Sequence, residues 1–261
     1  MGKPLFRWTV GHCLQQGLDI LVESFDKTIN CLGEDKFDWF VCYNGLSVDQ
    51  VRFISSKIGN RRISLMSQNW ADCPIPDICW SPARSDGSFE WNGGKCGGTL
   101  WKVTPPRIRM DSHEIIMDND IILLKKFSQI EEFLNSDKVM LLEEPIRFYG
   151  RYDNILPKEE PYFNSGFIGL PPMYDFGADI FKHWEENGKL EKLTHADEQG
   201  LLTYALYNKE NIRIHKDQMI EVLGRDYSYK HTGQEEALHF TQSNRMPNHY
   251  PWKNYLGAKN G

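Results

Sequence analysis

Apolar residues recur along this chain with two different spacings, one typical of strands and the other typical of helices. Short apolar runs predict strands at Phe6–Val10, Phe37–Tyr43, Ile63–Met66, His113–Met117, Val139–Leu142 and Tyr162–Leu170. Helical spacing, capping and breaking residues predict helices at Cys13–Leu32, 48–58, Leu100–Pro105, Phe127–Leu134, Asp179–Trp184 and Glu198–Tyr207. Because the two signals alternate, the pattern predicts an α/β fold with a central, mostly parallel sheet flanked by helices.

The segment 67–99 departs from this alternation, because it is rich in Pro, Gly, Ser, Asp and Trp and shows no regular period. Irregular segments of this length inside a compact domain are often functional loops. No stretch has the composition of a linker between domains. We therefore expect residues 1–261 to form a single domain.

Composition narrows the classes of function. The chain has 261 residues, of which 40% are hydrophobic and 25% charged, as in an ordinary globular domain. Its formal net charge of -6 argues against a surface that tracks nucleic-acid phosphates. No run approaches the ~20 apolar residues that a membrane-spanning helix needs, so we expect no membrane span.

Cysteine spacing gives no metal signature. The chain has six cysteines, and no two of them follow the C-x-x-C pattern. Free thiols are typical of a reducing compartment, so we expect a cytoplasmic location. The sequence is silent on the oligomeric state.

The triplet Asp118-Asn119-Asp120 is the strongest chemical signal in the chain. It follows an apolar strand and precedes another apolar run, 121–124. Alternate residues of an extended chain face the same side, so the two carboxylates can converge on one cation. Hard oxygen ligands suit Mn²⁺ or Mg²⁺. A surface turn is the alternative, but the flanking apolar segments explain it poorly.

Each of three further motifs has two possible interpretations, one structural and one functional. In Phe163–Phe167, Asn164 and Ser165 interrupt an apolar strand, which suits recognition of a sugar hydroxyl or a plain β-bulge. In His195–Leu202, acidic residues open a helix, where they complement its dipole or lie near a reacting carbon. His239 follows an apolar pair and is either structural or a third metal ligand.

Taken in order, these motifs resemble the GT-A glycosyltransferases, and most closely the glycogenin and galactosyltransferase-like group known as family eight. The matching segments are Trp101-Lys102, Pro105-Pro106, Glu114–Ile122, Phe163–Gly166, Asp197–Leu202, His239–Thr241 and, more loosely, Pro251–Lys253. The resemblance implies a GT-A, Rossmann-like fold with a nucleotide-binding half, 1–125, and an acceptor-binding half, 126–261.

The same resemblance implies a set of roles. Asp118, Asp120 and His239 would coordinate Mn²⁺, or Mg²⁺ in its place. The donor nucleotide sugar would be bound by Val41, Tyr43, Asn44, Lys102 and Asn119. The transferred sugar and the reacting centre would be surrounded by Asn164, Asp197, Glu198 and Gln199.

The chain also departs from the group's pattern. The group has a Lys before the Pro-Trp pair, and this chain lacks it before Pro251. Arg245, His249 or Lys253 would then supply the cation for the diphosphate. The motif Asp197-Glu198-Gln199 carries one acidic residue more than the group's Asp-Gln pair. We therefore expect a divergent member or a neighbouring family.

The implied reaction moves a sugar from a nucleoside diphosphate sugar, expected to be a UDP-sugar, to a hydroxyl acceptor on a carbohydrate or another molecule. An inverting enzyme needs a carboxylate base, for which Asp197 or Glu198 is the candidate. The resemblance favours retention, which needs no such base. Two alternatives are a nucleotidyltransferase that makes nucleotide sugars and a non-catalytic carbohydrate-binding protein, the latter suggested by Trp70, Trp80, Phe89 and Trp91.

Overall fold

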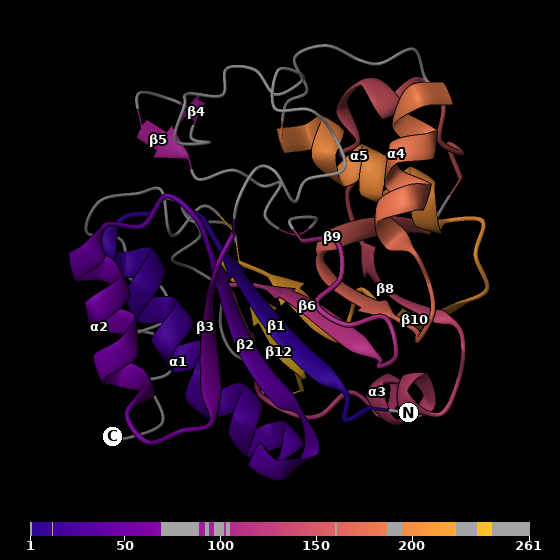
Figure 1. Ribbon diagram of the computed structural model, residues 1–261. Helices are drawn as coiled ribbons and strands as arrows, with labels where there is room; N and C mark the ends of the chain where they lie inside the picture. Colours follow the sequence, from indigo (N-terminus) through magenta and orange to yellow (C-terminus); the bar gives the residue numbers. More distant parts are fainter. Residues whose placement is uncertain are drawn as a thin grey trace.

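The computed structural model describes residues 2–11, 13–68, 89–91, 94–96, 102, 105–159, 161–186, 195–222 and 234–241. A seven-stranded sheet runs through the middle of the molecule, and helices cover it (Figure 1). The predicted α/β fold with a mostly parallel sheet is confirmed.

The central sheet has the strand order β10-β8-β9-β6-β1-β2-β3. The strands are β1 (Leu5–Val10), β2 (Asp38–Tyr43), β3 (Ile63–Ser67), β6 (Glu114–Asp118), β8 (Val139–Glu144), β9 (Tyr162–Leu170) and β10 (Asn211–Ile214). Neighbouring strands are parallel except β9, which is antiparallel to both β6 and β8. The carboxyl ends of β1, β2, β3 and β6 therefore lie at one edge, where ligands bind in open α/β sheets.

Two groups of helices pack on opposite faces of this sheet (Figure 1). One face carries α1 (Gln15–Leu32) and α2 (Val48–Ile58), and the other carries α4 (Phe176–Glu186) and α5 (His195–Leu206). The short helices are α3 (Ser128–Leu134) and the 3₁₀ turns η1 (Glu34–Lys36) and η5 (Gly150–Asn154).

Local sequence explains where the first two helices begin and end. Helix α1 buries Leu18, Leu21 and Phe25, which are spaced for one helical face. It ends at Gly33, whose φ of 91° favours glycine. Helix α2 begins at Ser47, which forms a reciprocal capping box with Gln50.

The core lies on both faces of the sheet, and β6 divides it. Ile115 and Met117 pack into one cluster and Ile116 into the other, as the alternation along a strand requires. Trp8 and Trp39 stack at 5.5 Å between ring centroids in the first cluster. This rigid aromatic layer fixes β1 and β2 beside β6.

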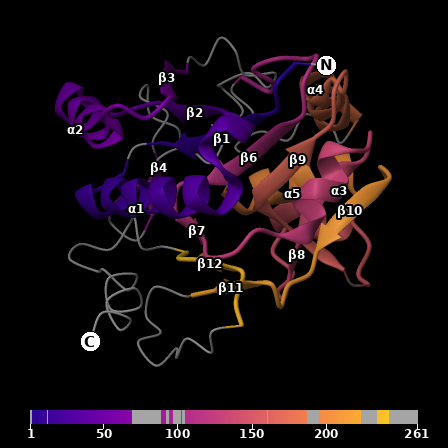
Figure 2. The same cartoon turned by 90° about the horizontal axis from the view of Figure 1, so that it is seen from below.

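A second, small sheet has the order β11-β12-β7, from Met219–Glu221, Ala237–His239 and Ile121–Leu123. Figure 2 shows these three strands side by side next to α1. Strand β12 pairs antiparallel with β7, so His239 lies opposite Ile121. The backbone N–H of Phe240 donates to the carbonyl of Asp120 at 2.9 Å. This sheet brings a late segment of the chain to the acidic triplet.

Strand β9 is continuous but bulged. Leu141 of β8 pairs with Ile168, whereas the next residue, Leu142, pairs with Asn164. Residues 165–167 are thus left without β8 partners, although Phe167 still pairs with Met117 on the other side. The bulge interpretation of the Asn164-Ser165-Gly166 interruption is confirmed.

Some secondary-structure elements were not predicted from the sequence, and some predicted ones lie outside the described residues. The sequence did not predict β10 or β11, whereas β7 and β12 coincide with the short apolar runs at 121–124 and 237–238. Of segment 67–99, the structure describes 67–68, β4 (Phe89–Trp91) and β5 (Gly94–Cys96), which pair as a hairpin. Of the helix predicted at 100–105, only residues 102 and 105 are described.

Within the described part of the chain, no helix has both the length and the apolar character needed to cross a membrane. Cys13, Cys31 and Cys42 are free thiols. Cys73, Cys79 and the side chain of Cys96 lie outside the described residues. The cytoplasmic location stays a prediction.

We expect Gly200→Ala to destabilise the fold, because α5 packs tightly on η5. A Cβ at Gly200 would lie 2.6 Å from the Cβ of Tyr152 and closer still to the carbonyl oxygen of Tyr149. Overpacking of this kind costs about 1–3 kcal/mol, which exceeds the ~0.5–1 kcal/mol gained from alanine's helix propensity. Urea unfolding measures the loss. Ser55→Ala on the exposed face of α2 is the control, and equal stability of the two variants would contradict the packing argument.

Candidate active site

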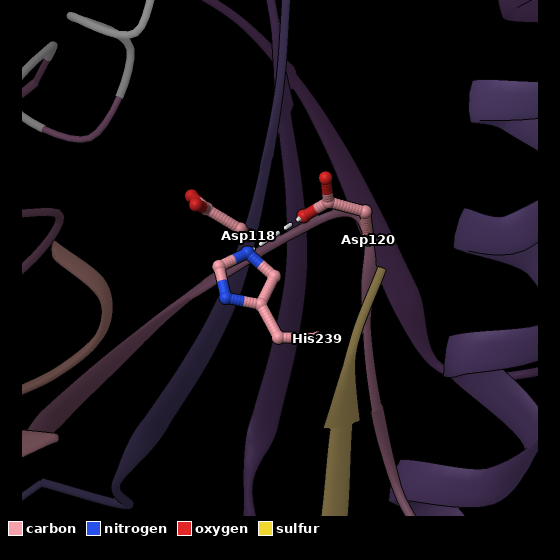
Figure 3. Close-up of side chains that lie close together, drawn as sticks. All are labelled: Asp118, Asp120 and His239. Carbon is pink, nitrogen blue, oxygen red and sulfur yellow. Dashed lines mark ion pairs between the residues drawn. The ribbon is translucent and has the colours of Figure 1, made fainter. Parts of the chain in front are cut away.

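The three predicted metal ligands converge. Asp118 ends β6, Asp120 lies in the turn before β7, and His239 ends β12. One ligand atom from each lies within 4.8 Å of the others. Figure 3 shows His239 facing Asp120, with Nε2 of the imidazole 3.4 Å from a carboxylate oxygen and Asp118 beside them. Two carboxylates and one imidazole form a donor set that fits a divalent cation such as Mn²⁺ or Mg²⁺.

The cluster is held together by opposite charges. Burial disfavours the charged imidazole of His239, but the hydrogen bond and charge of Asp120, with the charge of Asp118, raise its pKa to about 9. Burial raises the pKa of Asp118 despite the neighbouring ammonium of Lys102. A divalent cation on these ligands would take the place of the imidazolium proton in balancing the two carboxylates.

Lys102 joins this cluster to the bulge of β9 and to α5. Its Nζ lies 3.0 Å from Oδ2 of Asp118 and 3.6 Å from Oε1 of Glu198, and it donates to Oγ of Ser165 at 2.9 Å. The residue is 6% exposed. Burial lowers the pKa of its amine, but the charges of Asp118 and Glu198 outweigh burial and raise it. The structure thus places predicted Lys102 at the centre of the site.

The bulge of β9 supplies polar groups to the same region. The Asn164 side chain donates to Glu144 and accepts from the backbone N–H of Gly166 at 2.6 Å. A Cβ at Gly166 would lie 2.7 Å from Oδ1 of Asn164 and 3.0 Å from Oδ2 of Asp118. A larger residue at position 166 would therefore have to displace the side chains of Asn164 and Asp118.

The two acidic residues that open α5 separate into different environments. Both carboxylate oxygens of Asp197 are engaged by Arg151, which donates its backbone N–H at 2.7 Å, Nε at 3.2 Å and Nη2 at 3.1 Å. Glu198 instead lies beside Lys102, and burial raises its pKa to about 7. Oε1 of Gln199 is 3.5 Å from Oγ of Ser165. Glu198 and Gln199 therefore border the site, whereas Asp197 anchors the helix to η5.

The residues predicted to bind the donor nucleotide lie in different environments, and one of them is buried in the core. Val41 is fully buried in the core, so it has no exposed atom to offer a base. Tyr43 ends β2 and Asn44 follows it, and the amide of Asn44 donates to the carbonyl of Gln68 at 2.8 Å. Asn119 donates to the carbonyl of Gly17 at 3.1 Å, which ties the triplet to α1. Arg245, His249 and Lys253 lie outside the described residues.

Sequence inspection missed three residues of this region. Ser165 lies in a motif that the sequence analysis had recognised, and it bridges Lys102 and Gln199. The sequence pattern could therefore have identified it. Glu144, at the end of β8, reaches Asn164 only through the register of the bulge. Glu221 lies opposite His239 across β11 and β12. No periodic signal marks either glutamate.

Comparison with solved structures decides the fold family. The galactosyltransferase LgtC, in complex with donor and acceptor sugar analogs, has a TM-score of 0.59 and 11% identity over 95% of this chain and 92% of its own. The chain has a GT-A fold. Mouse xyloside xylosyltransferase 1 superposes with a TM-score of 0.52 and 11% identity over 94% of this chain and 100% of its own.

The GT-A fold also recurs in a longer protein. The bifunctional glycosyltransferase WbbM has a TM-score of 0.62 and 11% identity, over 94% of this chain but 47% of its own. No family model and no curated protein sequence matches the chain. The likeness therefore lies in the fold, and the divergence expected from the sequence agrees with these low identities.

We expect Glu144→Gln to stabilise the protein at high pH. Burial, followed by the charge of Glu221, raises the pKa of Glu144 from 4.5 to about 7. The folded state therefore binds this proton more tightly than the unfolded state, and the stability it confers is lost as pH rises from about 4.5 through about 7. Since glutamine stays neutral, the gain in melting temperature over wild type should be larger at pH 8 than at pH 5.

The control for this comparison is Glu132→Gln on the exposed surface of α3, which should shift the melting temperature equally at both pH values. Both measurements use metal-free buffer, so that metal binding at Asp118, Asp120 and His239 does not differ between the two pH values. A gain for Glu144→Gln that is the same at pH 5 and pH 8 would contradict the assignment of a raised pKa.

Proposed function

We propose that this protein is a metal-dependent glycosyltransferase, which moves a sugar from a nucleoside diphosphate sugar to a hydroxyl acceptor. The observation that carries the proposal is the convergence of Asp118, Asp120 and His239 at the carboxyl edge of a GT-A sheet, beside Lys102 and Glu198. We propose UDP-sugar as the donor and Mn²⁺ or Mg²⁺ as the ion, from the motif resemblance and the donor set. The bond broken joins the anomeric carbon to the diphosphate.

When bound, the cation would act as a Lewis acid toward the leaving diphosphate. The residues of this chain then orient the reactants. Asp118, Asp120 and His239 would hold the ion, and Lys102 would add a second positive charge within reach of the same phosphates. Residues 1–125 would serve the nucleotide, with Tyr43 and Asn44 beside the base, and residues 126–261 the acceptor.

Glu198, Gln199 and Asn164 would surround the transferred sugar. Glu198 is buried with a pKa near neutrality, so it can accept or donate a hydrogen bond to a sugar hydroxyl. Asp197 is engaged by Arg151, so the candidate base for an inverting reaction is Glu198 alone of these two. Because Glu198 also faces the ammonium of Lys102, we favour retention, in which the leaving phosphate takes the acceptor proton.

The first test is a thermal-shift screen of nucleotide sugars with Mn²⁺, because a ligand that binds only the folded state raises the melting temperature. Donor hydrolysis is then measured with and without Mn²⁺.

We expect Asp118→Ala to lower the Mn²⁺-dependent rate of donor hydrolysis by more than 100-fold, since even outer partners of a metal site contribute about 10- to 100-fold.

The matched control is Asp49→Ala, whose side chain is 90% exposed on α2. It should leave the hydrolysis rate unchanged. Full activity of a folded Asp118→Ala variant would overturn the metal assignment. A binding module would shift in melting temperature without hydrolysis, and a nucleotidyltransferase would release pyrophosphate from a nucleoside triphosphate.

Substitutions at the neighbouring residues Glu198 and Asp197 should affect different properties, catalysis in the first case and stability in the second. Glu198→Gln should lower kcat by up to about 100-fold, because it removes the carboxylate that orients the transferred sugar and Lys102, and a ~1 Å misplacement can cost this much; stability should change little. Asp197→Asn should lower the free energy of unfolding by about 1–3 kcal/mol, because it weakens charge-assisted hydrogen bonds to Arg151. Steady-state kinetics and urea unfolding of both variants measure this separation. The reverse pattern would assign the catalytic role to Asp197.

A further inference from the structure

A fully buried arginine in the central sheet holds the backbone that carries Lys102. Arg7 lies in the middle of β1 and is 0% exposed. Its Nη2 donates to the carbonyl oxygen of Lys102 at 3.0 Å, and its Nη1 donates to that of Pro105 at 2.5 Å. The planar guanidinium thus grips two carbonyls of the segment that leads into β6.

The guanidinium forms an ion pair with a buried carboxylate. Nε of Arg7 lies 3.1 Å from Oε1 of Glu114, the first residue of β6, which is also 0% exposed. The second oxygen of Glu114 lies 3.3 Å from Nε of Arg107 and accepts from the backbone N–H of Ile108 at 2.9 Å. Arg7, Glu114 and Arg107 therefore form a buried triad beneath the segment.

Arg107 extends the triad to the residues that follow β9. It donates to four backbone carbonyls at 2.6–3.0 Å, those of Pro171, Tyr174, Arg109 and Ser112. The first two follow β9, the strand that carries the Ser165 bulge. The segment with Lys102 and the end of the strand with Ser165 are thereby tied to one charged group.

A buried triad of this kind is weak evidence for stability, since well-packed apolar residues often replace such groups without loss. Its geometric effect is more specific. The fork of an arginine reaches two acceptors in a fixed plane, which a lysine cannot do. The Lys102 ammonium, at the other end of the same residue, must meet Asp118, Ser165 and Glu198 together.

We propose that Arg7 is a positioning residue for Lys102. It fixes the Lys102 backbone, so that the ammonium stands between the acidic triplet and α5 without reorganisation when the donor binds. This inference rests on the proposed transfer reaction, because Lys102 matters there as the second cation for the diphosphate. Arg7 acts through Lys102 and contacts no substrate.

A double-mutant cycle tests the proposal in the full chain. We expect Arg7→Lys to lower kcat/KM for Mn²⁺-dependent hydrolysis of UDP-glucose or UDP-galactose by up to about 100-fold, the loss that a ~1 Å misplacement can cause. In the Lys102→Met background, the same substitution should change the residual rate by less than about twofold, because the residue it positions is absent. Equal losses in the two backgrounds would overturn the proposal.

The matched control is Arg109→Lys, on the same segment. Arg109 donates to Asp38 and to the carbonyl of Lys3, and its side chain is 38% exposed. We expect this variant to keep the wild-type kcat/KM in both backgrounds. A loss equal to that of Arg7→Lys would show that any disturbance of the segment suffices, and would overturn the specific role of Arg7.

A second measurement separates this inference from the proposed function, because it needs no turnover. Acetylation of Lys102 by acetic anhydride, followed by peptide mass spectrometry, should be slow in wild type, where the residue is 6% exposed. Arg7→Lys should raise that rate severalfold, and Arg109→Lys should not. If Arg7→Lys fails to fold, the double variant Arg7→Gln, Glu114→Gln removes both charges and takes its place. Unchanged labelling in a folded variant would overturn the proposal, whether or not a donor is hydrolysed.

Discussion

Three carboxylates, those of Asp118, Asp120 and Glu198, are gathered with little solvent around them at the carboxyl edge of the sheet. Burial of unpaired negative charge is among the most costly arrangements in a folded protein, so each must meet a cation. Lys102 and His239 meet that need, and they come from segments more than 100 residues apart. Much of the fold around the site can be understood as the means of bringing these two cations to one place.

Each cation has its own structural support. His239 reaches Asp120 because β12 pairs with β7 and Phe240 donates to the carbonyl of Asp120. Lys102 reaches Asp118 from a segment whose carbonyls are held by Arg7. The bulge of β9 completes the enclosure, because it turns Ser165 to Lys102 and brings Gly166 against the side chains of Asn164 and Asp118. A donor with a diphosphate and a divalent cation would enter a site whose charges are already arranged.

The same charge balance explains why neighbouring residues of one motif differ in role. Asp197 and Glu198 are adjacent on α5, yet one is neutralised by Arg151 and the other by Lys102. Successive residues on a helix point about 100° apart, so two acids in sequence cannot share one partner. The extra acidic residue of this motif is thus accounted for by a structural anchor on η5.

The sequence by itself determined the elements with a strong period and the chemistry of the acidic triplet. Strands β1, β2, β6, β8 and β9 were predicted, because apolar runs report burial directly. The triplet was recognised as a cation site because two carboxylates are enclosed between apolar segments. The expected extended conformation was wrong, because Asn119 and Asp120 form a buried turn between β6 and β7. Tertiary structure alone decided the pairing of Asp197 with Arg151, the burial of Val41, the place of Glu144 and the grip of Arg7 on Lys102. Those contacts join positions far apart in the chain, or depend on strand register, and a local pattern of polarity records neither.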